Sequence, residues 1–353
     1  MQNEKILIAM SGGVDSSVAA LLLQESGKDC VGATMRLFSP ALLGLDALPS
    51  DDIGDARRIA EQLGMPFHAL DLSDGFCQNV IDYFIRTYME GGTPNPCVQC
   101  NRTMKFGKLL EAGRELGCDA IATGHYAKIA QDTNGRWQVS RAADLSKDQT
   151  YVLWQLSQEQ LAHTYLPLGD YTKEEIREIA EANGFCNAQR RDSQDICFIP
   201  DGDYVGFIER YTGKRFPSGN FIDRDGNILG KHNGMIRYTI GQRKGLGIAF
   251  GKPTYVCAKN AKNNTVTLGD NSDLFRVSLT AHAVNLIATE RLDAPIRVQA
   301  KVRYAASPAW ATAEQTDTDT LRLSFDEPQR AICAGQSVVL YDGNTLIGGG
   351  IID

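Results

Sequence analysis

The stretch Lys5–Leu23, KILIAMSGGVDSSVAALLL, decides how the N-terminal part of this chain folds. Ile6 to Met10 form an apolar run of strand length, and Ser11-Gly12-Gly13 interrupts it before a helix-like run of Val, Ala and Leu begins. Paired glycines let the backbone turn sharply, and the first amides of a helix attract an anion. The pattern therefore predicts a strand, a glycine turn and a helix that together bind a phosphate group.

This loop is not of the Walker A type, because no Gly-Lys pair in the chain is followed by Ser or Thr. SGGVDSS resembles the pyrophosphatase loop of the ATP-pyrophosphatase superfamily, whose members cleave ATP to AMP and pyrophosphate. The resemblance implies that ATP, with Mg²⁺, is bound by Ala9, Met10, Ser11, Gly12, Gly13, Val14, Asp15, Ser16, Met35 and Gly124. An ordinary glycine turn is the structural alternative for the loop, and core packing is the alternative for Met35.

Composition is that of an ordinary folded protein. With 353 residues, 43% of them hydrophobic and 22% charged, the chain is long enough for two or three domains. It has no apolar stretch of membrane-spanning length and no signal-peptide pattern, so we expect a cytoplasmic protein without a membrane partner. The formal net charge of −7 argues mildly against nucleic acid as a partner, unless a local basic patch supplies phosphate contacts.

Strand-like and helix-like segments alternate over the first two hundred residues or so. Strands are expected over residues 30–37, 67–72 and 120–123, and helices over 52–63, 76–88 and 104–116, with Asp51 or Asp52 as a cap and Gly64 as a stop. Repeated strand–helix units imply a parallel sheet with helices on both faces. We therefore expect a doubly wound, Rossmann-like α/β fold with its ligand at the carboxyl ends of the strands.

The sequence changes character near residue 203. A short helix is expected over 203–211, a glycine-rich and basic segment over 213–251, and short strands with turn signals from Thr254 onward. We divide the chain into an α/β domain (1–202), a small central domain (203–278) and a C-terminal β-barrel (279–353). The central segment carries the candidate backbone-contacting residues Lys231, Arg237, Arg243 and Lys244, for which a solvated surface loop is the alternative.

A second chemical feature is the segment TPNPCVQCNRTMKF, residues 93–106. Its prolines favour an extended loop that presents Cys97 and Cys100 just before a helix. A helix N-terminus lowers the pKa of a thiol, and we expect Arg190 and Arg191 to lower the pKa of Cys197 as well. A lone Cys-x-x-Cys occurs in zinc sites, redox motifs and iron–sulfur sites, and the scattered histidines argue against zinc.

Seven segments together resemble motifs of the tRNA-specific 2-thiouridylase family, in the same order along nearly the whole chain. They are SGGVDSS, TPNPCVQCNRTMKF, ATGHYAK, SKDQTYVL, DSQDICFI, YTIGQRKGLGIA and FDEPQRAICAGQSVVLYDGNTLIGGGII. Membership implies an ATP-dependent tRNA-uridine 2-sulfurtransferase with an adenine-nucleotide hydrolase core, a central domain and a C-terminal β-barrel. Its substrate would be the wobble uridine, position 34, of the tRNAs for lysine, glutamate and glutamine.

The resemblance also implies roles for single residues. Cys197 would carry a persulfide loaded by a sulfur-relay protein or cysteine desulfurase, and Cys100 would attack it, leaving a transient Cys100–Cys197 disulfide. The implied contacts are Asn95, Pro96 and Cys97 to the target base, and Lys147, Asp148, Gln149, Arg303 and Tyr304 to tRNA. For Lys147 and Arg303 a solvated charge is the alternative, and His125 is expected to be structural.

Cys97 departs from the family pattern, in which many members have aspartate at this position. Any acid–base role of residue 97 is therefore in doubt. With Cys100 and Cys197 it makes a set of three thiols, which resembles related tRNA thiolases that hold a [4Fe–4S] cluster by three thiolates. The persulfide and cluster routes both remain open at this point.

Two other functional classes share part of this pattern. An amide-forming ATP-pyrophosphatase synthetase of a small metabolite would have SGGVDSS but has no need of the two cysteine motifs. A non-catalytic iron–sulfur or tRNA-binding module would tolerate the loss of Asp15 and Ser16. Pyrophosphate release from ATP, measured with and without tRNA, separates these classes.

Overall fold

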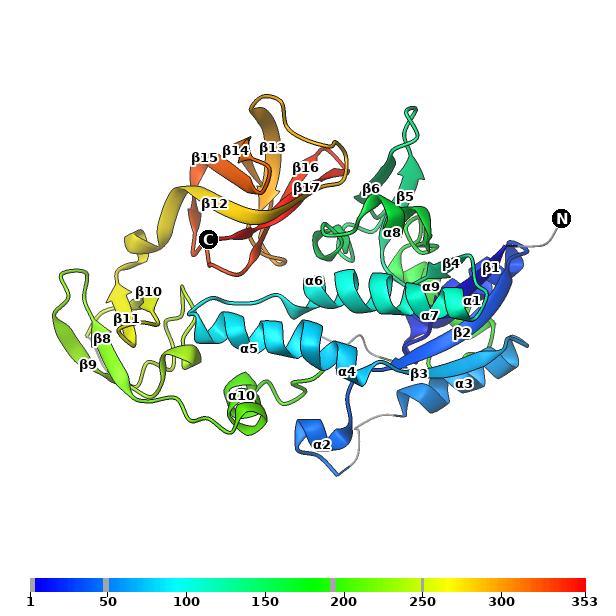
Figure 1. Cartoon of the computed structure of the whole chain (residues 1–353), viewed down its shortest axis with the longest axis horizontal. Coiled ribbons are helices and arrows are strands. Elements are labelled where there is room, and N and C mark those ends of the chain that lie inside the picture. Colours follow the sequence, from blue (N-terminus) through cyan, green and yellow to red (C-terminus); the bar gives the residue numbers. More distant parts are fainter. Residues whose placement is uncertain (1–3, 47–50, 191–194, 249–250) are drawn as a thin grey trace.

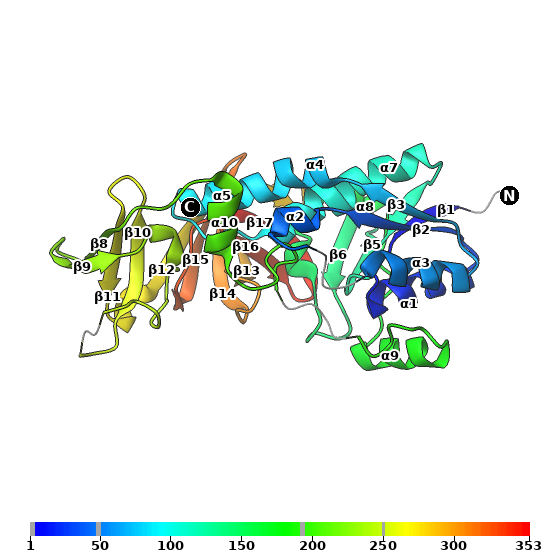
Figure 2. The ribbon, with the colours of Figure 1, turned by 90° about the horizontal axis from the view of Figure 1, so that it is seen from below.

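The computed structural model describes residues 4–46, 51–190, 195–248 and 251–353 of the chain. An α/β part lies at the end of the molecule that holds the N-terminus, and a small central β-sheet lies at the opposite end (Figures 1 and 2). A β-barrel formed by the C-terminal residues lies between them, alongside two helical rods that run from the α/β part toward the central sheet (Figure 1).

A five-stranded sheet forms the α/β part, and its neighbouring strands are all parallel. In spatial order these are β3 (Phe67–Asp71), β2 (Asp29–Arg36), β1 (Lys5–Ala9), β4 (Ala120–Ala122) and β7 (Thr164–Tyr165). In the central strand, Ile6 and Ile8 belong to one core cluster and Leu7 to another, because successive side chains point to opposite faces. The predicted doubly wound α/β fold is confirmed.

Helices cover both faces of the sheet. α1 (Val14–Glu25), α3 (Asp52–Gln62) and α9 (Lys173–Ala182) contribute to the core on one face, and α7 (Leu109–Glu115) contributes to the core on the other. The Asp51 side chain caps α3 by accepting a hydrogen bond from the Gly54 amide at 3.0 Å. Gly64, with φ of +68°, follows the end of α3, as the sequence predicted.

Two helical rods lead away from the sheet. One joins α4 (Ser73–Phe76) to α5 (Asp82–Met89) through a π-helical stretch over Cys77–Ile81, and the other joins α6 (Pro96–Cys100) to α7 through Asn101–Lys108. The helices predicted over 76–88 and 104–116 are confirmed. The second begins earlier than predicted, because Asn95 caps it and Pro96 occupies its first position. The remaining α-helices are α2 (Pro40–Leu43), α8 (Gln158–Ala162) and α10 (Tyr204–Thr212).

The central part is a four-stranded sheet with its own small core. Its order is β10 (Tyr255–Asn260), β11 (Thr265–Gly269), β8 (Gly219–Ile222) and β9 (Ile228–His232). Phe221, Val256 and Val266 are fully buried in that core.

Six antiparallel strands form the C-terminal barrel. Their order is β12 (Phe275–Leu286), β15 (Thr320–Arg330), β14 (Ala309–Asp317), β13 (Ile296–Lys301), β16 (Ser337–Asp342) and β17 (Thr345–Ile352), and pairing of β12 with β17 closes the barrel. The sequence did not predict that β5 (Ala127–Gln131) and β6 (Trp137–Arg141), a hairpin from the α/β part, would extend this sheet at β17.

The α/β part and the barrel share one hydrophobic core. Leu7 of β1 and Tyr341 of β16 belong to the same buried cluster. Trp154 donates its indole N–H to Ser337 Oγ at 3.0 Å, and Tyr151 donates its hydroxyl to the Ser337 carbonyl at 2.8 Å. The barrel is therefore fixed against the α/β part by packing and by buried hydrogen bonds. Among the described residues, the helices are all too short or too polar to span a bilayer.

Candidate active site

The phosphate loop turns at the carboxyl end of β1. Gly12 has φ of +74°, and a Cβ added there would lie 2.7 Å from the Asp52 carbonyl oxygen. Gly13 is the residue before α1, and Val14 is its buried first residue. The Ser11 amide donates to Ser16 Oγ at 3.1 Å, and Ser16 Oγ donates to the Gly13 carbonyl at 3.0 Å. Serine side chains thus fix a loop that only glycine can form.

Residues from neighbouring strands surround the loop as the sequence predicted. A Cβ on Gly124, just after β4, would lie 2.8 Å from the Asp15 carbonyl carbon and the Ser16 nitrogen. Ala9 ends β1, and the buried Met10 follows it with its carbonyl accepting from Thr34 Oγ1 at 2.6 Å. Met35 near the end of β2 is partly buried against the core beneath the sheet. Its packing role and a contact to a bound nucleotide are compatible.

A buried lysine faces the carboxylate of the loop. Lys173, the first residue of α9, is 7% exposed and donates to the two Asp15 carboxylate oxygens at 2.7 and 2.8 Å. The Tyr126 hydroxyl also donates to Asp15 at 2.7 Å. Asp15 is therefore held in place and its charge is balanced before any ligand binds.

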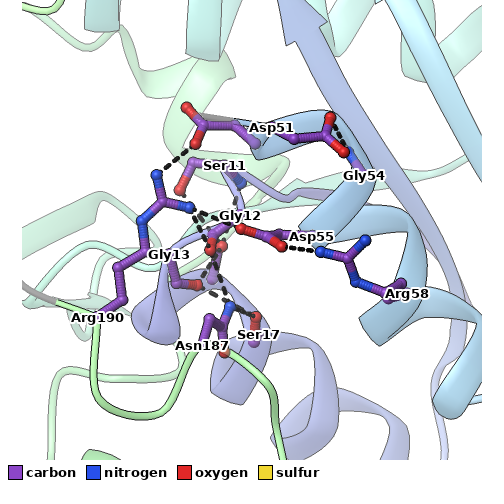
Figure 3. A network of polar contacts seen from close by, with 12 residues as sticks. Ser11, Gly12, Gly13, Ser17, Asp51, Gly54, Asp55, Arg58, Asn187 and Arg190 are labelled. Carbon is purple, nitrogen blue, oxygen red and sulfur yellow. Dashed lines mark hydrogen bonds and ion pairs between the residues drawn. The ribbon is translucent and has the colours of Figure 1, made fainter. Parts of the chain in front are cut away.

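The segment after α9 ties the loop from the other side (Figure 3). Asn187, 4% exposed, donates to the Gly12 carbonyl and to Ser17 Oγ, both at 2.9 Å. Arg190 donates to the Gly12 carbonyl at 3.2 Å and pairs with Asp52 and with Asp55 of α3 (Figure 3). Sequence reasoning missed Asn187 and gave Arg190 a different role, because a single asparagine and a single arginine 170 or more positions from the loop carry no local pattern.

Cys100 belongs to an aromatic cluster that also contains Phe198, the residue after Cys197. Cys100 is buried at the end of α6 together with Phe76 and Phe84. Phe198, the neighbour of Cys197, lies in that cluster with ring centroids 5.6 Å from Phe76 and 5.3 Å from Phe84. Segments nearly one hundred positions apart therefore meet beside α5.

The pKa values of the thiols are raised, and the prediction that they would be lowered is wrong. Desolvation raises the pKa of Cys100 to about 11 and that of Cys197 to about 12, although the Cys197 residue is solvent-exposed. The neighbouring thiols of Cys100 and Cys97 add to the increase at Cys197. Desolvation also raises the pKa of Cys97. Burial outweighs the helix N-terminus here, because apolar surroundings favour the neutral thiol.

Arg190 does not act on Cys197 as we predicted. Arg190 is engaged with Gly12, Asp52 and Asp55, and Arg191 lies outside the described residues. Among the described residues, Lys105 is a cation that lowers the pKa of Cys97, Cys100 and Cys197, partly offsetting desolvation. Lys105 lies in the TPNPCVQCNRTMKF segment, and the sequence motif alone did not indicate a role for it.

All nine cysteines are free thiols, so Cys100 and Cys197 are not joined in this state. Within the described ranges, which include Cys97, Cys100 and Cys197, no three His, Cys, Asp or Glu side chains gather in an arrangement that could hold a metal ion.

His125 is structural, as expected. It is 6% exposed, and its Nδ1 lies 2.7 Å from Thr123 Oγ1. Burial, with a smaller effect of Lys105, holds its pKa well below the ordinary value, so the imidazole stays neutral.

The residues expected to contact tRNA gather between the α/β part and the barrel. Asp148 accepts from the Ala142 amide at 3.2 Å and from Thr150 Oγ1 at 2.7 Å, and Gln149 accepts from the Tyr126 amide at 3.0 Å. Lys147 is half-buried beside them, and Arg303 of the barrel is exposed.

Tyr304 links this group to the cysteines. The Tyr304 side chain is exposed at the surface of the barrel. Its hydroxyl donates a hydrogen bond to the Asp148 carbonyl at 3.4 Å. Desolvation, with smaller effects of Asp148 and Cys97, raises the pKa of Tyr304. At the start of α6, Asn95 accepts from the Val98 amide at 3.4 Å and Pro96 is buried.

The basic residues of the central part are exposed. Lys231, Arg243 and Lys244 face solvent, and Arg237 pairs with Glu209 of α10 at 3.2 Å. These side chains are accessible to an acidic partner.

Comparisons with known proteins agree with this geometry. The chain matches the family models of the tRNA methyl transferase HUP domain over residues 4–201, the tRNA methyl transferase PRC-barrel domain over 205–270 and the aminomethyltransferase beta-barrel domain over 276–352. The tRNA-specific 2-thiouridylase of Clostridioides difficile (strain 630) is 50% identical to it, covering 99% of this chain and 98% of that protein. That of Acetivibrio thermocellus is 47% identical, with 100% of each covered. Such identity along the full length, together with the phosphate loop and the cysteine motifs, shows that the chain belongs to the tRNA-specific 2-thiouridylase family.

Proposed function

We propose that this protein replaces the C2 oxygen of the wobble uridine, position 34, with sulfur in the tRNAs for lysine, glutamate and glutamine, at the expense of ATP. The observation that carries the proposal is the pairing of a pyrophosphatase-type loop with Cys100 and Cys197, whose segments meet in one aromatic cluster. A uracil oxygen is a poor leaving group, so it must be activated before sulfur can replace it. Transfer of AMP from ATP supplies that activation and releases pyrophosphate.

The loop residues would bind and orient ATP. Amides at the start of α1 and the hydroxyls of Ser11 and Ser16 face the phosphates, and Ala9, Met10, Met35 and Gly124 border the nucleotide. Mg²⁺ would neutralise charge on the departing pyrophosphate. Its direct ligands would be chiefly phosphate oxygens, because Asp15 is the loop's carboxylate and already pairs with Lys173.

Cys197 would deliver sulfur as a persulfide loaded by a sulfur-relay protein or a cysteine desulfurase. Its terminal sulfur attacks C2 of the adenylated uridine, and AMP leaves with the former C2 oxygen. The Cys100 thiolate then attacks the inner sulfur of Cys197, which cleaves the S–S bond and leaves the sulfur on the base. The resulting Cys100–Cys197 disulfide takes two electrons from a dithiol reductant to regenerate both thiols.

The raised pKa values mean that the thiols of Cys100 and Cys197 are both neutral at neutral pH. A proton acceptor or a change of environment on tRNA binding must then produce each thiolate. Lys105 would stabilise the thiolates as they form.

The three thiols of Cys97, Cys100 and Cys197 also have the number and chemistry of ligands for a [4Fe–4S] cluster. Their described arrangement does not form a metal-holding group, so we derive no step through a cluster. Anaerobic reconstitution with iron and sulfide, followed by iron counting and EPR, decides between the routes. A colourless protein that thiolates tRNA from a persulfide alone supports the proposal.

The tRNA would lie against the α/β part and the barrel. We assign Asn95, Pro96 and Cys97 to the target base, and Lys147, Asp148, Gln149, Arg303 and Tyr304 to the surrounding nucleotides. Exposure of Arg303 and the closeness of Tyr304 to Asp148 support this interface. We also propose a cytoplasmic site of action and the domain divisions 1–202, 203–278 and 279–353, although β12 begins at Phe275 and crosses the second division.

Pyrophosphate release tests the proposed reaction. Release that depends on tRNA bearing an unmodified wobble uridine, with 2-thiouridine appearing in that tRNA, supports it. The amide-forming alternative predicts release stimulated by a small carboxylic acid and independent of tRNA. If Ser16→Ala and Cys197→Ala proteins both thiolate tRNA at the normal rate, the proposed roles of the loop and of the persulfide are wrong.

A further inference from the structure

The loop that leads into the target-base residues is held by both of the other parts of the molecule. It joins α5 to α6 over residues 90–95, and it passes between the central sheet and the barrel (Figure 1). On the barrel side, the Thr93 amide donates to the Ala334 carbonyl at 2.8 Å. The Gln336 side chain donates to the carbonyls of Thr93 at 2.9 Å and Pro94 at 3.2 Å.

The central sheet reaches the same loop through one side chain. Lys259 of β10 donates its ammonium group to the Gly92 carbonyl at 3.3 Å. Gly91 also faces this side chain, because a Cβ added to Gly91 would be in ordinary van der Waals contact with Lys259 Cβ at 3.8 Å and with the Met235 methyl group at 3.7 Å. Lys259 thus contacts the loop only a few residues before Cys97.

A lysine is an unfavourable residue for this place. Desolvation lowers the pKa of Lys259 to about 8, and the titratable group that faces it is the buried Cys333 thiol of the barrel. Arg303 is the other charged group near that thiol. Among the described residues no carboxylate is recorded as pairing with Lys259, so an apolar side chain of similar length would be better for stability.

We propose that Lys259 is a positioning residue for sulfur transfer: its hydrogen bond to the Gly92 carbonyl fixes the loop that presents Asn95, Pro96 and Cys97 to the target base. This inference rests on the proposed function and gives the central sheet a part in the reaction beyond contact with RNA. Lys259 and Gln336 hold the loop from two sides, so removal of either contact lets it move relative to Cys197.

Lys259→Met and Lys259→Arg test the proposal, with Lys262→Met as the control on the exposed turn of the same hairpin. We expect Lys259→Met to unfold at the same or a higher temperature but to lose roughly tenfold to a hundredfold in the kcat of thiolation, with the KM for ATP unchanged. Lys259→Arg should restore much of the rate, because it keeps a cationic donor. The control should match the wild type in every measurement.

A second measurement does not depend on thiolation. The rate at which iodoacetamide alkylates Cys97 can be followed by mass spectrometry without ATP or tRNA. It should rise several-fold in Lys259→Met, because Cys97 is exposed but its sulfur is desolvated, and a released loop gives the reagent a freer approach to that sulfur. If the wild-type protein fails to thiolate tRNA, the proposed function is wrong. The alkylation rates still test whether Lys259 fixes the loop. Equal alkylation in Lys259→Met and wild type overturns the positioning role, as does a loss of activity that only parallels a loss of stability.

Discussion

Lys173 and Asp15 form a bidentate ion pair, with Nζ 2.7 and 2.8 Å from the two carboxylate oxygens, at the point where α9 meets the phosphate loop. The lysine side chain is 8% exposed and the aspartate 30%. A carboxylate in this loop would otherwise repel the phosphates of ATP. The pair therefore lets an anionic residue stand in an anion-binding site.

Replacing Lys173 with Met should leave Asp15 partly buried and uncompensated. We expect a loss of about 2 kcal/mol in the free energy of unfolding and an increase in the KM for ATP. Urea unfolding and pyrophosphate-release kinetics measure the two effects. Lys128→Met is a matched control, because Lys128 and Asp170 form an exposed pair expected to contribute less than about 1 kcal/mol. An unchanged KM in Lys173→Met would contradict the role given to the pair.

Lys105 supplies the cation that favours the thiolates of Cys97, Cys100 and Cys197. Lys105→Met should therefore raise the pKa of all three thiols and slow sulfur transfer several-fold, while pyrophosphate release stays near normal. Single-turnover assays that follow pyrophosphate and 2-thiouridine separately detect this difference. Lys108→Met, on the same helical rod but paired with Glu111 at the surface, is the control. Equal loss of both products would argue that Lys105 serves adenylation.

Much of the α/β fold could be predicted because its signals are local. Apolar runs, the Asp51 cap and glycine stops each lie within a few residues of the element that they define. The β5–β6 hairpin was missed because its partner, β17, lies about two hundred positions away and its strands alternate only weakly. Asn187, and the contact of Arg190 with the phosphate loop, were missed for the same reason. The pKa of Cys100 was predicted in the wrong direction because the prediction considered only the helix N-terminus. The sequence does not show that the thiol is buried among Phe76, Phe84 and Phe198.

The Cys100 thiol gives a pH prediction. Its folded-state pKa of about 11 lies above the ordinary value of 9.0, so roughly one molecule in a thousand holds the thiolate at pH 8. Alkylation of Cys100 should rise about tenfold per pH unit from pH 7 to 10. The contribution of this thiol to the free energy of unfolding is fully present below pH 9 and is lost as the pH rises through 11. The reason is that the thiol of the unfolded chain, with the lower pKa, releases its proton before the thiol of the folded chain does.

Peptide mass spectrometry after timed iodoacetamide treatment measures the Cys100 rate, and exposed Cys186 in the same samples reports reagent activity. A Cys100 rate that levels off near pH 9 would show that desolvation does not control this thiol.

Asn187 offers the sharpest test of how the phosphate loop is held. Its amide nitrogen donates to the Gly12 carbonyl and to Ser17 Oγ at 2.9 Å, and Asp has the same shape but no such donor. In Asn187→Asp, a buried carboxylate would face the Gly12 carbonyl, so the loop should lose its turn and the KM for ATP should rise about tenfold or more. Asn183→Asp makes the same chemical change on the exposed end of α9 and should leave the KM unaltered. Alkylation of Cys197 does not require ATP, so an unchanged alkylation rate in Asn187→Asp would locate the defect in the nucleotide loop. A normal KM for ATP in this variant would show instead that Gly12 keeps its conformation without the Asn187 contact.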